Sequence, residues 1–326
     1  MPLQIRLFSG TTGLNNRIDP VRLSFDREAG IAELSEAVNI TIDSSGRVNR
    51  QKGYTLLTSG DFHSMCPFDC GGYTLAVRAN VGLIAIDEHG NTTTVNASIN
   101  SANGVTMDYE MASDGSKKFI YYMNGFDKGR VFDRTHYEWE TGDYVGPDTT
   151  KALDDPPVGH LLCLFNGRMY VAINNVVYAS ERLNFGKFNY EDGYLLFPGR
   201  IAFLGRVSDG LFISDSFSTY FLRGQDLMPD GGVEPFALEK ISDKPIVTGT
   251  CSRTEAENIG LDITGEVMLV WTDYGCFAAG SGGYFRNMTR DKLIRRIPAQ
   301  GYNYLPDSTA GASIILNDEQ FITTFT

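Results

Sequence analysis

The chain has 326 residues, of which 42% are hydrophobic and 21% charged, so it can build one large domain or two medium ones. Its formal net charge at pH 7 is −12, whereas proteins that grip nucleic acid phosphates usually carry the opposite sign. The longest apolar runs, such as residues 119–123, are far shorter than the roughly 18 residues of a membrane-spanning helix, and the N-terminus lacks the apolar core of a secretory signal, so neither a membrane protein nor a secreted one is expected.

The N-terminal part of the sequence predicts an arm followed by a single domain. Residues 1–36 are expected to form the arm and connector, with a short helix over 26–37 that Gly30 weakens. The domain, 37–326, opens with strands at 37–42 and 47–50. The turn between them has Gly46 to supply a positive φ, so the pair is expected to be a hairpin.

Five further hairpins follow, each with two short apolar or alternating strands ended by Gly, Asn, Asp or Ser. Their paired strands are 71–77 and 81–86, 117–123 and 129–132, 167–173 and 175–179, 210–214 and 218–222, and 265–271 and 275–279. Weaker strands flank these pairs, at 92–95, 105–110, 160–165, 201–207 and 236–239. The sequence therefore predicts an all-β fold with little helix.

The hairpins recur every roughly 40 to 50 residues, which is typical of the four-stranded blades of a β-propeller. An irregular β-sandwich with hairpins at similar spacing is the alternative. Near the C-terminus, a turn or two of helix is expected at 290–297, followed by a last hairpin at 312–316 and 320–325. We expect six blades, of which five lie within the chain and the sixth combines this last hairpin with the strands at 37–50, so that closure removes exposed edges.

Two N-terminal segments resemble a known family. Gly13-Leu-Asn-Asn-Arg-Ile-Asp-Pro20 is followed at 37–54 by an asparagine-bearing strand, an Asp-x-x-Gly turn and an arginine-bearing strand that ends in glycine. This pattern resembles the opening of tail hub and nozzle proteins of short-tailed bacteriophages. Where that family usually has Arg-Arg-Pro-Gly, this chain has Arg50-Gln51-Lys52-Gly53. The resemblance implies a β-propeller that assembles as a ring below the portal and its adaptor, through which genome DNA leaves.

Residues typical of catalysis or metal binding do not form a known motif. The four histidines match no HxH or HExxH pattern, and no nucleophile elbow or phosphate-binding loop is present. Cys66 and Cys70 have no second Cys or His pair at zinc-ligand spacing, so no metal and no cofactor are expected. Carboxylates remain candidates for a glycosidase, because many propellers place Asp and Glu around the channel. They are Asp108, Glu110, Glu138, Glu140, Asp154 and Asp155.

Two long gaps between the predicted hairpins are candidates for contacts with other proteins. Residues 133–159 and 224–244 are rich in Asp, Gly, Pro and Thr, and connections of this length are usually functional or disordered. Since aromatic residues dominate interface energies, the anchors we expect are Tyr137, Trp139, Tyr144 and Phe236. A blade's outer strand that wanders along the rim is the alternative.

The sequence as a whole favours a non-enzymatic structural protein of a virion tail, made in the cytoplasm of a host bacterium. The simplest assembly is a homohexameric ring that contacts the portal adaptor and other tail proteins, without a membrane partner. An acidic lining would let DNA pass through the channel without binding it. The alternative from another class is a glycan-binding or glycoside-hydrolysing β-propeller.

Overall fold

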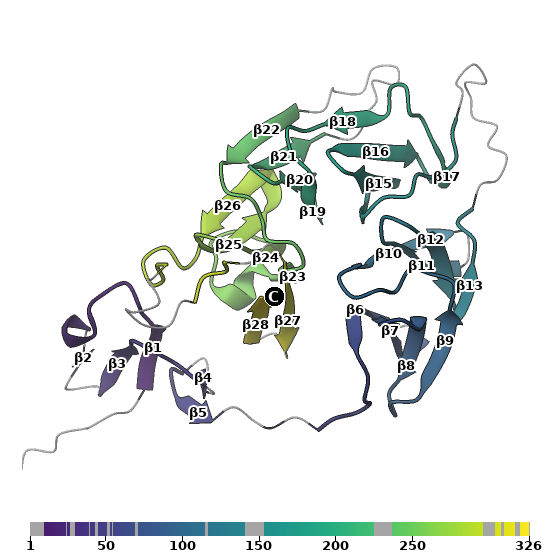
Figure 1. Ribbon diagram of the computed structural model, residues 1–326. Coiled ribbons are helices and arrows are strands. Elements are labelled where there is room, and N and C mark those ends of the chain that lie inside the picture. Colours follow the sequence, from purple (N-terminus) through teal and green to yellow (C-terminus); the bar gives the residue numbers. More distant parts are fainter. Residues whose placement is uncertain are drawn as a thin grey trace, which may run out of the picture. The chain divides into compact units, whose positions relative to one another are not determined.

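The computed structural model shows an all-β protein built mostly from antiparallel sheets, as predicted (Figure 1). The structure describes residues 10–23, 25–26, 30–38, 40–42, 45–50, 53, 55–68, 71–114, 117–140, 153–224, 237–295, 304–307, 310–316 and 320–325. By contacts between Cα atoms the chain divides into two compact units, one formed by residues 55–243 and the other by 1–54 together with 244–326. The predicted division into an arm and one domain stays a prediction.

The unit of residues 55–243 contains four antiparallel sheets whose strands pair in chain order. The first two sheets are β6 (Phe62–Phe68), β7 (Tyr73–Arg78), β8 (Gly82–Asp87) and β9 (Thr92–Asn96), then β10 (Asp108–Asp114), β11 (Lys117–Met123), β12 (Lys128–Phe132) and β13 (Thr135–Tyr137). The third has β14 (Leu161–Phe165), β15 (Arg168–Ile173), β16 (Val176–Glu181) and β17 (Asn184–Phe188), with β18 (Tyr194–Leu196) also paired to β16. The fourth has β19 (Ile201–Val207), β20 (Gly210–Asp215), β21 (Thr219–Arg223) and β22 (Ala237–Ser242).

Each predicted hairpin of this unit is confirmed as the central strand pair of one sheet. The tight turns explain the sharp ends of the apolar runs. Asn80 lies between β7 and β8 with φ 58°, and Asn174 lies between β15 and β16 with φ 52°. Asparagine tolerates this left-handed conformation better than other residues with a side chain. The predicted strand at 201–207 coincides with β19, whereas β10 begins at Asp108, three residues later than expected.

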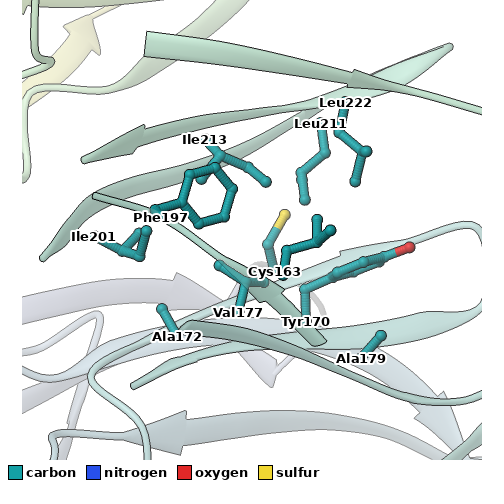
Figure 2. Close-up of a cluster of buried hydrophobic side chains, with 11 residues drawn as sticks. Cys163, Tyr170, Ala172, Val177, Ala179, Phe197, Ile201, Leu211, Ile213 and Leu222 are labelled. Carbon is teal, nitrogen blue, oxygen red and sulfur yellow. The ribbon is translucent and has the colours of Figure 1, made fainter. Parts of the chain in front are cut away.

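Adjacent sheets of this unit pack face to face, which is why their central strands read as continuous apolar runs. In β11, Ile120 and Tyr122 pack against the first sheet, while Tyr121 and Met123 pack against the third. Figure 2 shows the next such core, where side chains of the third and fourth sheets point toward one another around Cys163. Burial on both faces removes the alternation of polar and apolar residues that a half-exposed strand would show.

The other unit has one complete four-stranded sheet and several smaller pieces. The complete sheet is β23 (Ser252–Glu255), β24 (Glu266–Thr272), β25 (Gly275–Gly280) and β26 (Tyr284–Asn287), whose central pair is the fifth predicted hairpin. A three-stranded sheet joins β1 (Gly10–Leu14), β3 (Ile31–Leu34) and β2 (Phe25–Asp26). Short 3-10 turns occur at Pro20–Arg22, Ala256–Ile259 and Ser281–Gly283.

Neither helix expected in this unit is found in the residues that the structure describes, which leave out 27–29, 296 and 297. Where 26–37 was expected to be helical, Gly30 takes φ 69° and the chain continues as β3, parallel to β1. At 290–295 the chain forms a turn in which the Thr289 carbonyl accepts from the backbone N–H groups of Lys292 (3.0 Å) and Leu293 (2.8 Å). The backbone N–H of Asn16 donates to the Lys292 carbonyl, and the Asn16 side-chain oxygen accepts the backbone N–H of Ile294. These groups therefore bond outside the segment instead of within a helix.

The two terminal hairpins form as predicted, but as separate sheets. The N-terminal hairpin, β4 (Ile40–Ile42) with β5 (Val48–Arg50), is two-stranded, and so is the C-terminal hairpin, β27 (Gly311–Leu316) with β28 (Gln320–Phe325). Among the described residues of this single chain, no backbone pairing joins the two into the expected closing sheet.

Candidate functional site

The first strands of the second and third sheets are linked by side chains of β10. A carboxylate oxygen of Asp108 accepts a hydrogen bond from the backbone N–H of Leu162 at 2.7 Å. A carboxylate oxygen of Glu110 accepts one from the backbone N–H of Leu164 at 3.0 Å. Since side chains alternate along a strand, these two carboxylates lie on the same face of β10 and reach two donors on one edge of β14. The carboxylates thus take the place of a neighbouring strand for this edge.

An arginine of the fourth sheet completes this arrangement. Arg206 of β19 donates to the carbonyl oxygen of Leu164 at 2.9 Å, and the same nitrogen lies 3.5 Å from Glu110 Oε1. Leu164 is therefore bonded through its N–H to Glu110 and through its carbonyl to Arg206. We name Asp108, Glu110 and Arg206 the carboxylate–arginine clamp, because together they connect the first strands of three successive sheets.

The surroundings of the clamp favour the proton-bound form of one carboxyl. The pKa of Asp108 is raised to about 7, mainly by burial; the backbone N–H groups of Leu162 and Tyr109 oppose this rise, and the charge of Glu110 adds to it. Burial also raises the pKa of the Cys66 thiol on β6 to about 12, with the charges of Asp108 and Glu110 acting in the same direction. Near neutral pH, Asp108 can therefore gain or lose a proton while the Cys66 thiol keeps its own.

This geometry assigns Asp108 and Glu110 to bonding between strands. A glycosidase pair must present one carboxyl to the leaving oxygen and the other to the sugar ring or to water. Here the described contacts of both carboxylates run to N–H groups of β14 and, for Glu110, also to Arg206 and to the N–H of Met111 at 3.1 Å. The clamp can hold three sheets in register and can exchange a proton at Asp108.

The other candidate carboxylates lie in local contacts of their own. Glu140 pairs with Arg130 at 3.0 Å, and Asp155 pairs with Lys187 at 3.0 Å. Asp154 forms a backbone bridge with Phe188, and Glu138 lies 3.4 Å from His136 Nε2. The structure gives none of them a hydrogen bond or ion pair with a clamp residue among the contacts of the described part of the chain.

Each of the four histidines contacts a polar group, which is close in sequence for three of them and on another sheet for His160. His160 Nε2 lies 2.8 Å from the Ile201 carbonyl, and burial lowers its pKa. Burial likewise lowers the pKa of His63, whose Nδ1 lies 3.0 Å from the Ser64 hydroxyl. His89 lies beside Glu88, and His136 beside the Tyr122 hydroxyl. These contacts orient the four rings.

Of the four predicted interface aromatics, the structure describes two. Trp139 is only 2% exposed, its indole N–H donates to the Phe185 carbonyl at 2.8 Å, and its ring centre lies 4.9 Å from that of Tyr121. It is a core residue between the second and third sheets, which corrects the expectation that it anchors a partner. Tyr137 is 39% exposed and stays a predicted anchor. Tyr144 and Phe236 lie outside the described residues.

Groups that could bind a metal and helices that could cross a membrane are both absent from the described part of the chain. Over the ranges the structure describes, no three His, Cys, Asp or Glu side chains are placed to hold a metal ion. Cys66 is a free thiol there, whereas Cys70 falls outside those ranges. Among the described elements, no helix has the length and apolar character needed to cross a bilayer.

The sequence did not indicate Arg206 as a functional residue. Arg206 contacts Glu110, which is 96 positions away in the chain, so no local spacing could reveal the pair. One signal was present, namely a charged residue near the end of the otherwise mostly apolar strand 201–207. Asp108 and Glu110 were singled out for their alternation on one strand, and that placement on one face is confirmed.

Comparisons with known proteins add little to this description. A scan against models of protein families finds no match, and a search of curated proteins finds none either. Among solved structures, the chain is similar to PorZ, an essential bacterial surface component of the type-IX secretion system of Porphyromonas gingivalis, with 13% identity and a TM-score of 0.39 over 77% of this chain and 29% of PorZ. It is also similar to the CNH domain of AfRom2, with 8% identity and a TM-score of 0.30 over 74% of this chain and 82% of that one. The chain thus spans less than a third of PorZ, and TM-scores this low carry no argument about fold or function.

Proposed function

We propose that this chain is a six-bladed β-propeller and a structural subunit of a short phage tail, part of a ring-shaped hub or nozzle below the portal and its adaptor. The observation that carries the proposal is the serial face-to-face packing of four-stranded sheets in the unit of residues 55–243. Sheets that pair their strands in chain order and pack one on the next are the building plan of propeller blades. The sheet β23–β26 supplies a fifth blade, and the terminal hairpins supply the strands of the sixth.

The clamp fits this proposal as a device that fixes neighbouring blades. The first strand of a blade lies nearest the central channel, where strands of neighbouring blades come together. Side-chain bonds from Asp108 and Glu110 to β14, and from Arg206 to β14, would hold the inner strands of three blades in register. A wall that must keep its shape while DNA passes benefits from such fixed bonds.

The assignment to a phage tail rests on the resemblance carried by residues 13–54. Under it the protein has no catalytic task, assembles as a homohexamer, and meets the portal adaptor and other tail proteins. It is made in the bacterial cytoplasm and ends in the virion. The net charge of −12 supports passage of DNA without binding, because like charges repel.

Measurements of assembly, and of glycan binding and hydrolysis, test this proposal. Mass photometry of the purified full chain should give a ring-sized species, and mass spectrometry of purified phage particles that encode the chain should detect it in the tail. A stable monomer that never enters particles would overturn the proposal. Micromolar binding on a glycan array, or hydrolysis of a glycoside that is lost in Glu110→Gln, would favour the glycan-active propeller instead.

A further inference from the structure

The C-terminal hairpin has an outer edge that the rest of the described chain leaves open. The backbone N–H of Gly311 donates to the Thr248 carbonyl at 2.8 Å, on the side of β27 away from β28. Phe325 of β28 lies opposite Gly311. In an antiparallel pair, opposite residues direct their backbone groups either toward each other or away from each other, so those of Phe325 point away from β27. The same alternation places the N–H and carbonyl groups of Phe321, Thr323 and Phe325 on the free edge of β28.

This edge has none of the features that protect an exposed strand. Residues 320–325 read Gln-Phe-Ile-Thr-Thr-Phe, without a charge or a proline and with three large apolar side chains. Natural edge strands carry charges, prolines or bulges against unwanted pairing. The outer strand β22 carries Glu239 and Lys240, and the outer strand β26 carries Arg286. The open edge of β28 lacks the charges that β22 and β26 carry, so it can accept a neighbouring strand.

The N-terminal hairpin has the complementary features. Its first strand, β4, is uncharged and reads Ile-Thr-Ile, whereas its second strand, β5, ends in Arg50 and follows Arg47, both of them exposed. In the complete sheets the strands pair in chain order, and in two of them the outermost strand, β22 or β26, carries charged residues. Adding the hairpin so that β4 pairs with β28 gives a four-stranded sheet, β27-β28-β4-β5, that ends on the arginine-bearing strand.

The faces of the two hairpins also match. Phe321 and Phe325 point to the side of Trp271, with ring centres 6.5 and 5.7 Å from its own. Because side chains alternate, Ile40 and Ile42 lie on one face of β4 and can extend that apolar side, which leaves Thr41 on the side of Thr324.

The N-terminal hairpin is held elsewhere on its own chain. The N–H of Thr11 in β1 donates to the Gly46 carbonyl in the hairpin's turn at 2.6 Å, and the N–H of Ala37 before β4 donates to the Tyr304 hydroxyl at 2.8 Å. With both ends bonded in this way, β4 and β28 remain in separate sheets of the single chain. Pairing with a second copy would leave these two bonds in place, because their atoms lie outside β4 and β28.

We propose that β28 of one copy pairs with β4 of the next, so that the closing blade of every subunit contains two strands from its neighbour. The interface is heterologous, since a C-terminal edge meets an N-terminal edge, and such a contact repeats around a ring until the ring closes. The inference deepens the ring assembly proposed above, and it names the surface and the occupant: a second copy of this chain, bound by strand addition.

Cross-linking between differently tagged copies tests the pairing. Full-length chains carrying Thr41→Cys and Thr324→Cys are co-expressed with different tags and treated with a short bis-maleimide, with each single variant and the wild type as controls for the native cysteines. We expect a product that contains both tags and is absent from the controls. When both substitutions are on one chain, we expect ladders of linked chains. Links formed only within the chain, or no links in an assembled ring, would overturn the proposal.

A proline substitution tests the edge independently. Thr323→Pro removes an outward N–H of β28, and Thr323→Val is the matched control, because it keeps that N–H while losing the 2.8 Å contact with the Ser313 hydroxyl. Mass photometry should give monomers for the proline variant and rings for the valine variant. Rings with the proline variant would contradict strand exchange and leave the ring itself intact. A monomeric wild type would refute both, whereas cross-linked dimers without a ring would support the exchange and refute the tail assembly.

Discussion

The sheets of residues 55–243 and the hairpins near the chain ends differ in how far the chain itself completes them. Each of the four sheets pairs its strands from one continuous stretch and buries its central strands on both faces. The N-terminal and C-terminal hairpins have two strands each and leave edges open among the described residues. One sequence can therefore specify complete sheets from local stretches and still leave two two-stranded hairpins with edges open to a partner strand.

Core truncation should give the largest contrast between these regions. Ile120 in β11 is fully buried between two sheets, so Ile120→Ala should lower the free energy of unfolding by about 2–5 kcal/mol. Ile314 in β27 is 58% exposed, and Ile314→Ala should change it by less than about 0.5 kcal/mol in the monomer. Urea titration measures both. Equal losses would mean that the single chain already covers the C-terminal hairpin.

Substitutions at Asp108 test whether the clamp stabilises the complete sheets. Asp108→Ala leaves the Leu162 N–H without its acceptor and should cost about 1–3 kcal/mol, whereas Asp108→Asn keeps an oxygen there and should cost less. If the alanine variant unfolds at the same urea concentration as the wild type, the carboxylate is not a stabilising partner of β14.

The same residue predicts a pH dependence of stability. Burial raises the pKa of Asp108 from 3.8 to about 7, so the folded protein binds this proton more tightly than the unfolded chain. The contribution of Asp108 is therefore greatest below about pH 4 and is lost as the pH rises toward 7, by at most about 4 kcal/mol. Relative to Asp108→Asn, the wild type should lose stability between pH 4 and 7. A gain over this range would show that the pKa is lowered instead.

Trp139 separates core packing from partner binding. Trp139→Phe removes the bond to the Phe185 carbonyl and should cost about 1 kcal/mol in the free energy of unfolding. Because the indole is buried, the size of the assembly by mass photometry should not change. Loss of assembly at unchanged stability would restore Trp139 as an interface anchor, and Tyr137→Ala provides the comparison at a half-exposed aromatic.

The smallest expected effect concerns Arg206. Arg206→Met removes the donor to the Leu164 carbonyl and should cost about 1 kcal/mol or less, since the arginine is partly exposed. The matched control, Arg182→Met at an exposed turn, should stay within about 0.5 kcal/mol. Equal effects in thermal unfolding would remove Arg206 from the clamp.

Sequence reasoning predicted the hairpins well because their signals are local. Asn80 and Asn174 end apolar runs at tight turns, and such punctuation needs no knowledge of the rest of the chain. The helix expected at 26–37 was wrong because Gly30 redirects the chain and β1, from a distant segment, offers β3 its hydrogen bonds. Tertiary pairing here overrides a weak local propensity.

The clamp was predictable only in part. The alternation of Asp108 and Glu110 placed both on one face of a strand, but their partners on β14 and β19 are set by the stacking of sheets. Trp139 shows the opposite error, because a polar, glycine-rich stretch suggested an exposed loop while its indole enters a core. Contacts between residues far apart in sequence carry no spacing signal.

An electron cryo-microscopy map of the purified full chain would test the central claim most directly, at a resolution that separates strands. The account predicts a closed ring in which every subunit is a propeller, and in which the sheet that contains β27 and β28 has four strands, two of them traced to the neighbouring subunit. Single particles of one chain each, or rings whose closing sheets are traced to one chain alone, would contradict it.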